Sequence, residues 1–500
     1  MAAPDSTGTL DQLTPGMPIV YAGTKVARVS EELAARFRAG DAVLVAASTG
    51  ALLHVPKAVR ELVADAVQRA ESAFGVLNRT SDAAISRFFA GFAARLSNDG
   101  VWGEVAEANR RDVESATARG RSTTRLIATE RMRQGMIEGL AGFASAPSRR
   151  GEVLDRIAHE GFDVELIGAA VGIVGFVFEG RPNVLADATG VLRSGNSVVF
   201  RIGGDALGTA QALMQLALVP ALREADLPES AVVLVESAEH AAGWALFSDA
   251  RLGLAVARGS GPAVATLGSL AQQAGVPVSL HGTGGAWMVA SKAARADRFA
   301  EAVFRSLDRK ACNTLNVCCI ERSRAAELVP VLLDACKRAG DRLQQAYRLH
   351  VAQGSESYLP GELFSRSVSV RRAEGDVIEP QADLIALSEL GREWEWEQTP
   401  EITLVVVEDT AQAVAAFNAT SPRFIASLIS EDPEEHARFF AGTEAPFVGD
   451  SLTRWVDGQY ALSKPELGLT NWQFGRLFGR GGILTGDTVY TIRTRYVSRS

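Results

Sequence analysis

Residues 170–281 alternate between short apolar runs and longer amphipathic stretches, and this alternation limits the possible folds more than any other feature of the chain. The runs AVGIVGFVF, NSVVFRI, AVVLVE, LGLAVAR and VPVSL have the length and composition of β-strands. Helical stretches such as AVATLGSLAQQAG separate them. Strands that are apolar at nearly every position, with helices between them, are typical of a parallel sheet covered on both faces. We therefore expect an α/β protein with a nucleotide-binding architecture, which by itself fixes no function.

The remaining segments have less regular patterns. Residues 57–145 repeat apolar side chains at helical spacing, as in Val59, Val63, Val67 and Ala70, and predict helices that pack on the core. Residues 150–168 are compatible with a hairpin, and TVYTIRTRYV near the C-terminus alternates as a β-strand does. We expect an irregular region between the helix that begins near residue 324 and a strand that begins near 401. A chain of 500 residues exceeds the size of one hydrophobic core, so we expect at least two packed units.

Composition and charge exclude several classes of protein. No apolar run is long enough to span a membrane, and the N-terminal segment has no secretory signal pattern. Four cysteines cannot form a disulfide framework for a chain of this length, which favours a reducing cytoplasm. The net charge of −8 argues against a nucleic acid as the main partner. We expect a cytoplasmic protein that binds neither membrane nor nucleic acid.

The stretch SLDRKACNTLNVCCI, residues 306–320, holds most of the cysteines of the chain. A zinc site would need two C-x2-C pairs, or one such pair followed by spaced histidines. The spacing here is C-x5-C-C, no second pair follows, and no histidine lies between His281 and His350, so we predict no metal site. Cys318 and Cys319 lie in an apolar strand and are best explained as small buried side chains. Cys312 differs because it follows a polar, basic segment just before that strand, and it is the candidate for a reactive thiol.

Two glycine-rich turns follow strands in the alternating region. FRIGGDA carries Arg201, Gly203 and Gly204, and its guanidinium could pair with a phosphate or only with a surface carboxylate. ARGSGPAV resembles a dinucleotide-binding turn in which Val264 replaces the last glycine, and an ordinary strand–helix turn explains it equally well. Its candidate residues are Arg258, Gly259, Ser260 and Gly261.

Two further strand ends carry polar or flexible residues. EGRPNV places the charge of Arg181 and the amide of Asn183 at the carboxyl end of a strand, where open α/β sheets bind ligands. HGTGGA, with Gly282, frees the backbone for a close approach. These turns and the Cys312 loop could converge on one cleft.

The combination of these motifs resembles a known family. GFVFEGRPNVLADATGVLRSGNSVVFRIGGDA is similar to the core of the gamma-glutamyl phosphate reductase (glutamate-5-semialdehyde dehydrogenase) family, a branch of the aldehyde dehydrogenase superfamily. The likeness continues through GEVLDRI, ARGSGPAV, KACNTLNV and DSLTRWVDG, and covers roughly residues 57–497 in the same order.

The resemblance implies an aldehyde dehydrogenase-like fold. Its parts would be a Rossmann-like NADP-binding domain at 56–278, an oligomerisation crossing within it at 148–168, a catalytic domain at 279–485 and a C-terminal oligomerisation strand at 486–500. Residues 1–55 would be an extension of unknown role. A homodimer or homotetramer is expected.

The resemblance also implies roles for single residues. Cys312 would be the nucleophile, and its backbone N–H together with Asn183 would hold the developing oxyanion. Arg309 and Lys310 would favour the thiolate and receive an anionic leaving group. The remaining candidates for contacts with the substrate are Arg181, Asn313 and Arg454. The candidates for contacts with NADP(H) are the residues of the glycine-rich turns, Gly282 and, by alignment alone, Glu397.

Several positions depart from the family pattern. No Asp or Glu occurs between residues 262 and 296, and Leu280 stands near the place where hydrolytic aldehyde dehydrogenases carry a glutamate that activates water. A thioester on Cys312 would therefore hydrolyse slowly. Trp287 replaces a usual histidine, and Phe424 and Ile425 replace polar residues, which points to an acyl group other than gamma-glutamyl unless the alignment is displaced by a residue.

The sequence thus predicts an NADPH-dependent reductase that converts an activated carboxylate, such as an acyl phosphate, to a semialdehyde through a Cys312 thioester. The resemblance favours NADPH over NADH, with Arg201 as a possible partner of the 2′-phosphate. Glutamate 5-semialdehyde, an intermediate of proline biosynthesis, is the most direct product, and a related semialdehyde is nearly as well supported. A kinase would supply the acyl phosphate. The alternatives are a reductase of acyl-CoA or carrier-bound thioesters and a catalytically silent binding subunit.

Overall fold

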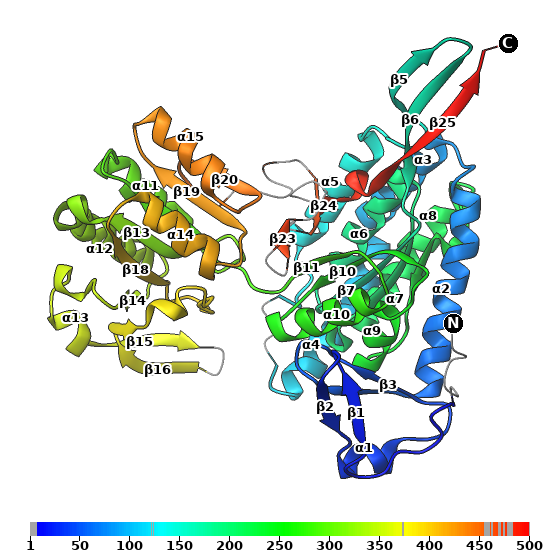
Figure 1. Ribbon diagram of the computed structural model, residues 1–500, viewed down its shortest axis with the longest axis horizontal. Helices are drawn as coiled ribbons and strands as arrows, with labels where there is room; N and C mark the ends of the chain where they lie inside the picture. The colour runs from blue at the N-terminus through cyan, green and yellow to red at the C-terminus, as the bar shows by residue number, and fades with distance from the viewer. Residues whose placement is uncertain are drawn as a thin grey trace. The chain divides into compact units, whose positions relative to one another are not determined.

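The structure, a computed structural model, describes residues 8–121, 123, 125–372, 375–454, 461, 464–468, 472–473, 476–477 and 484–499. These residues form two compact units (Figure 1). Unit 1 comprises the described residues within 1–282, 464–468 and 484–500, and unit 2 comprises those within 283–463 and 469–483. No helix in the described ranges is both long and apolar enough to cross a lipid bilayer.

Unit 1 is built on a five-stranded sheet in which all neighbouring strands are parallel. Its strand order is β11-β10-β7-β8-β9. The strands are β7 (Ile173–Phe178), β8 (Ser197–Ile202), β9 (Val232–Leu234), β10 (Leu252–Arg258) and β11 (Val278–His281). The chain order reverses between β7 and β10, and ligands of doubly wound sheets bind at the carboxyl ends of strands beside such a reversal.

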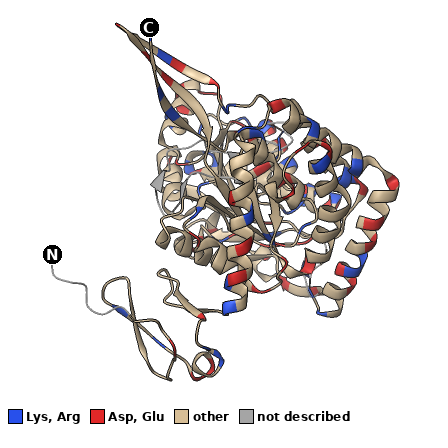
Figure 2. Ribbon diagram, turned by 90° about the vertical axis from the view of Figure 1, so that its right-hand side faces the viewer, with Lys and Arg blue, Asp and Glu red and all other residues tan. Residues whose placement is uncertain are grey.

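Helices cover both faces of this sheet, as the apolar pattern predicts. One face carries α3 (Asp82–Ser97), α4 (Asp99–Ala118), α5 (Glu130–Ser145), α6 (Val184–Ala188), α7 (Leu207–Leu213) and α8 (Val219–Glu224), with a π-helical segment (Met214–Leu218) between the last two. The other face carries α2 (Lys57–Leu77), α9 (His240–Phe247) and α10 (Gly261–Gln273). Acidic and basic residues are interspersed along the ribbons (Figure 2).

Two smaller parts belong to unit 1. The first contains the hairpin β1 (Pro18–Tyr21) and β2 (Lys25–Arg28), helix α1 (Glu31–Arg36) and the hairpin β3 (Ala42–Val45) and β4 (Leu52–Val55). The second is an antiparallel sheet of order β25-β6-β5, formed by β5 (Val153–His159), β6 (Phe162–Ala170) and β25 (Tyr490–Ser498). This sheet extends as an arm from the rest of the unit (Figure 1). The predicted hairpin at 150–168 and the predicted C-terminal strand are confirmed, whereas their role in oligomerisation stays a prediction.

Unit 2 is built on a seven-stranded parallel sheet of order β17-β14-β18-β13-β12-β19-β20. Its strands are β12 (Ala286–Ala290), β13 (Leu315–Glu321), β14 (Arg348–Ala352), β17 (Ala382–Ile385), β18 (Glu401–Val407), β19 (Ile425–Ile429) and β20 (Phe447–Gly449). A hairpin of β15 (Ser367–Arg372) and β16 (Gly375–Pro380) stands beside the sheet.

The helices of unit 2 also lie on both faces of their sheet. Helices α11 (Ala296–Ser306), α12 (Ala325–Arg342) and α13 (Glu362–Ser365) cover one face, and α14 (Thr410–Thr420) and α15 (Pro433–Gly442) cover the other. Cys318 packs into the first core and Cys319 into the second, because adjacent strand residues point to opposite faces. The prediction that both are buried apolar side chains is confirmed.

The predicted strands of residues 170–281 are confirmed, whereas the prediction of an irregular region up to about residue 400 is wrong. Strands β14 to β17 lie in that region. The predicted domain boundaries stay predictions.

Candidate active site

The loops at the carboxyl ends of the unit 1 strands lie against one another. A Cβ atom at Gly203 would come within 2.9 Å of the Gly180 amide nitrogen, and one at Gly282 would come within 2.9 Å of Gly261 Cα. A Cβ at Gly204 would lie 3.0 Å from Ala238 Cβ. A side chain at 203 or 282 would therefore collide with a neighbouring loop, which explains the glycines at these positions. The predicted Gly203, Gly204 and Gly282 thus lie together at the carboxyl end of the sheet.

Arg201 at the end of β8 is a buried cation. Its Nη2 donates to the carbonyl oxygens of Ala238, at 2.8 Å, and Glu239, at 3.1 Å, while its Nε has no partner among the described residues. Burial lowers the pKa of the guanidinium, and within the described ranges no carboxylate forms an ion pair with it. A buried charge without a counter-ion fits a phosphate of a dinucleotide.

Arg181 and Asn183, after β7, lie in a cluster of titratable groups. Arg181 forms an ion pair with Glu179, and Asn183 Nδ2 donates to Asp187 Oδ2 at 2.8 Å. Burial raises the pKa of Asp187 to about 7, although the charges of Arg258 and Arg181 oppose this shift.

His281 ends β11 in the same cluster. Burial, and then the charges of Arg258, Arg181 and Arg125, hold the pKa of its imidazole well below the ordinary value, so the ring is neutral at physiological pH. A neutral imidazole and a carboxyl group that titrates near pH 7 are features of functional sites, although structural clusters also have them. The pattern of apolar runs could reveal neither residue.

In unit 2, Cys312 lies in a loop at the amino end of β13, and hydrogen bonds fix that loop on both sides of it. Its carbonyl oxygen accepts from the Gly285 amide at 2.7 Å. Thr314 Oγ1 accepts from the Ala311 amide at 2.8 Å and donates to the Arg309 carbonyl at 2.6 Å. Cys312 is partly exposed, unlike the other three cysteines, and no cysteine of the described chain is in a disulfide.

Apolar side chains pack beside Cys312. Phe424, Ile425 and Ala286 form a small buried cluster, and both Cys312 and Phe447 pack against it. Trp287 instead lies in the core between β12 and α14, where it meets Phe417. Of the apolar replacements at 287, 424 and 425, those at 424 and 425 therefore lie in the surroundings of the thiol, whereas Trp287 does not.

The polar residues predicted near Cys312 pair with carboxylates or with one another. Arg454 is buried, and it binds Asp308 through Nε at 2.6 Å and Asn313 Oδ1 through Nη1 at 2.5 Å. Lys310 Nζ lies 2.5 Å from Glu393 Oε1, so its charge is paired rather than isolated. Arg309 and Glu397 are exposed.

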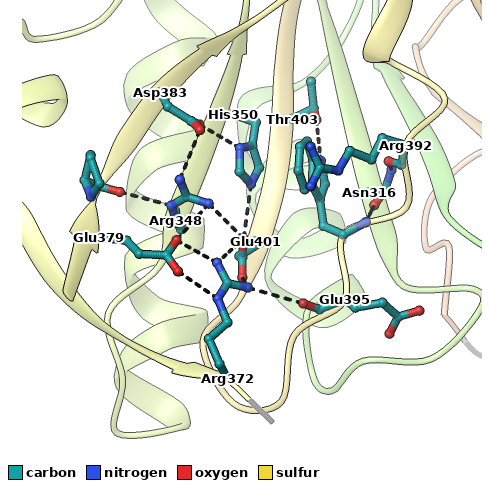
Figure 3. A network of polar contacts seen from close by, with 12 residues as sticks. Asn316, Arg348, His350, Arg372, Glu379, Asp383, Arg392, Glu395, Glu401 and Thr403 are labelled. Atoms are coloured by element: carbon teal, nitrogen blue, oxygen red, sulfur yellow. Dashed lines mark hydrogen bonds and ion pairs between the residues drawn. The ribbon is translucent and has the colours of Figure 1, made fainter. Parts of the chain in front are cut away.

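A largely buried polar network contacts residues 394 and 395, next to Glu393; its labelled members are seen in Figure 3. His350 contacts Asp383 through Nδ1 at 2.7 Å and Glu401 through Nε2 at 3.1 Å, and its ring stacks on Trp394 with the ring centres 3.4 Å apart. Arg348 and Arg372 complete the network through ion pairs with Glu379, Asp383 and Glu401. The sequence offered no signal for this network, since its members come from five separate strands.

The fold and the thiol loop define a class. The chain matches the model of the aldehyde dehydrogenase family over residues 41–351, and it belongs to this family of oxidoreductases. Its two doubly covered parallel sheets are those of the aldehyde dehydrogenase fold, as predicted.

Particular relatives agree with the narrower resemblance. The chain is 26% identical over 407 residues to a gamma-glutamyl phosphate reductase of Syntrophomonas wolfei, with 77% of this chain and 89% of the relative covered. The crystal structure of the gamma-glutamyl phosphate reductase of Thermotoga maritima has a TM-score of 0.74 at 20% identity, and the match covers 87% of this chain and 98% of that one. The NADP complex of glyceraldehyde-3-phosphate dehydrogenase from Methanocaldococcus jannaschii has a TM-score of 0.62 at 13% identity, with 90% and 97% covered.

Proposed function

We propose that the protein is an NADPH-dependent reductase that converts an acyl phosphate to a semialdehyde through a thioester on Cys312. The observation that carries this proposal is the contrast among the thiols. Cys312 alone is partly exposed, in a loop held by hydrogen bonds, while Cys318, Cys319 and Cys336 are buried. The similarity to gamma-glutamyl phosphate reductase supplies the substrate class.

The proposed chemistry begins when the Cys312 thiolate attacks the acyl carbon and phosphate leaves with the bonding electrons. The thioester is reduced to a hemithioacetal, which then collapses to the aldehyde and releases the thiolate. The Cys312 backbone N–H and the Asn183 amide are proposed to hold the oxyanion at each tetrahedral stage. Arg309, Lys310, Asn313, Arg454 and Arg181 remain candidates for contacts with the substrate.

The cofactor is proposed to bind at the strand ends of unit 1. The buried guanidinium of Arg201 would meet a phosphate, and Gly203, Gly204, Gly259, Ser260, Gly261 and Gly282 would let the backbone approach it. Arg258 and Glu397 remain proposed contacts. NADPH, when bound, supplies the hydride.

For the aldehyde to form, the thioester must be reduced faster than water hydrolyses it. The predicted place of the water-activating glutamate is filled by Leu280, an apolar side chain that cannot act as a base. This supports acyl exchange with a good leaving group, either phosphate or a thiol, rather than oxidation of an aldehyde to a free acid.

The proposed setting follows from the reaction. An acyl phosphate is labile in water, so a kinase acting on the free acid would have to supply it. We propose that the enzyme acts in the cytoplasm on small molecules, as a homodimer or homotetramer.

The reverse reaction tests the proposal. Purified enzyme is mixed with NADP⁺ and glutamate 5-semialdehyde or other aldehydes, and formation of NADPH is followed with phosphate, arsenate or coenzyme A as the acyl acceptor. Turnover that requires phosphate or arsenate is expected. Turnover with coenzyme A alone would contradict the acyl phosphate and favour the thioester reductase. Absence of turnover with every acceptor would favour a silent binding subunit.

A further inference from the structure

The carboxylate of Glu393 joins the two segments next to the thiol. Its Oε1 lies 2.5 Å from Lys310 Nζ, two residues before Cys312, and its Oε2 accepts from the Gly284 amide at 2.5 Å. The side chains of both charged residues are buried, with 6% of Lys310 and 13% of Glu393 exposed. A buried ion pair of this kind is held in one geometry, unlike an ion pair on the surface.

Glu393 also lies close to the backbone of the nucleophile. A Cβ atom at Gly284 would fall 2.6 Å from Cys312 Cα and 2.7 Å from Glu393 Oε1. The Gly285 amide, next along the chain, donates to the Cys312 carbonyl at 2.7 Å. The carboxylate therefore supports the two glycines just before β12, on which the thiol loop rests, and glycine at 284 leaves space for the carboxylate and for the Cys312 backbone.

The segment that presents Glu393 is itself fixed. Asn316, which is buried on β13, donates through Nδ2 to the Arg392 carbonyl at 2.8 Å and accepts at Oδ1 from the Trp394 amide at 2.9 Å. It thus binds the peptide groups on both sides of Glu393. The ring of His350 stacks on Trp394, the residue after Glu393.

The pairing has a consequence for charge. An isolated ammonium group two residues from a thiol would stabilise the thiolate, and an isolated carboxylate would destabilise it. Since Lys310 and Glu393 neutralise each other, neither effect acts in full on Cys312. If one partner of the ion pair is removed, the charge of the other should act in full on the thiol of Cys312.

We propose that Glu393 is a positioning residue that fixes the loop of Cys312 through Lys310 and the Gly284 amide and neutralises the Lys310 cation. The proposal rests on Cys312 as the reactive thiol of the proposed function. Lys310 is then held in place by Glu393, and its charge does not act alone on the thiol.

The test measures the rate at which iodoacetamide alkylates Cys312 between pH 5 and 10 in the full chain, with the modified peptide identified by mass spectrometry. In Glu393→Gln the amide still accepts from Gly284 but leaves Lys310 unpaired, so the pH of half-maximal rate should fall by about one unit. In Lys310→Met it should rise by about one unit, because the carboxylate is unpaired. The double variant should return close to the native profile.

Glu395→Gln is the matched control, since it removes an exposed carboxylate from the same segment and should change nothing. Unchanged profiles in both single variants, or shifts of the same sign, would overturn the role of Glu393. Opposite shifts in the pH of half-maximal alkylation cannot come from loss of folding, because unfolding would shift this pH in the same direction in both variants. If the alkylated residue in the native chain is not Cys312, the proposed function fails instead.

Discussion

Among single residues, burial separates the four thiols into one that can react and three that cannot. Cys318, Cys319 and Cys336 are fully buried, and burial raises the pKa of each, for Cys336 to about 12. A thiol of high pKa that solvent does not reach is inert. Adjacent cysteines in the sequence thus have different chemistry because Cys312 precedes the strand and the others lie within it.

Counting the reactive thiols tests this difference. In the native protein, a maleimide should label one cysteine quickly, and after denaturation it should label all four. Cys312→Ser should abolish the fast phase and leave the others protected. Fast labelling of Cys318 or Cys319 in the native chain would contradict the burial described above.

Asp187 gives a prediction about pH and stability. Its native pKa of about 7 lies above the ordinary value of 3.8, so the native state holds a proton that the unfolded state loses between these values. Stability therefore falls as pH rises from about 4 to 7, and the loss is complete above pH 7. Asp187→Asn cannot ionise and should escape this loss.

The two proteins should be compared by urea unfolding at several pH values. The difference in unfolding free energy, variant minus native, should grow by roughly 4 kcal/mol between pH 4 and 8 and then level off. A difference that does not vary with pH would show that the carboxyl group is not perturbed.

At the scale of elements, the sequence predicts those strands and helices whose buried positions carry apolar residues. The strands of the unit 1 sheet are continuous apolar runs, and the turns after them carry the predicted glycines. Strands β14 and β17 were not predicted because they carry charged or polar side chains. Arg348 and His350 are buried there, and both pair with the partly exposed Asp383. Glu393 could not be assigned as a neighbour of Cys312, since the contact joins distant segments and no periodicity marks it.

The network around His350 should be essential for the stability of unit 2. The two ring nitrogens of His350 lie within hydrogen-bonding distance of carboxylate oxygens, Nδ1 next to Asp383 and Nε2 next to Glu401. The same two carboxylates also form ion pairs with Arg348 and Arg372. His350→Leu removes one partner from each carboxylate and should lower the unfolding free energy by about 2–3 kcal/mol in denaturant titration.

Asp376→Asn serves as the comparison for His350→Leu. It breaks the exposed ion pair with Arg371 and should change the unfolding free energy by less than about 1 kcal/mol. If the two substitutions change the unfolding free energy equally, the network around His350 contributes no more to stability than an ion pair on the surface.

At the scale of the whole molecule, the C-terminal strand β25 completes a small antiparallel sheet. It pairs there with a hairpin that lies more than 300 residues earlier in the chain. β25 pairs with β6 from Tyr490↔Ala170 to Ser498↔Phe162. Ile157, Ile492 and Tyr496 of this sheet are exposed large apolar residues. Such residues on an exposed sheet favour association with another protein surface.

Ending the chain at Val489 should therefore remove the proposed oligomerisation strand. Light scattering should show the mass of an oligomer for the full chain and that of one chain for the truncated protein. Circular dichroism should show that the rest still folds, because the core of unit 1 lies elsewhere. A truncated protein with the oligomer mass of the full chain would place the interface at another surface.

The central claim is that Cys312 carries the acyl group before reduction. Intact-protein mass spectrometry of the enzyme mixed with an acyl phosphate, without NADPH, measures this directly. We predict a mass increase equal to the acyl group, located on the peptide that contains Cys312, lost on addition of NADPH and absent from Cys312→Ser. An acyl group on any other residue, or aldehyde formation at the native rate by Cys312→Ser, would contradict the account.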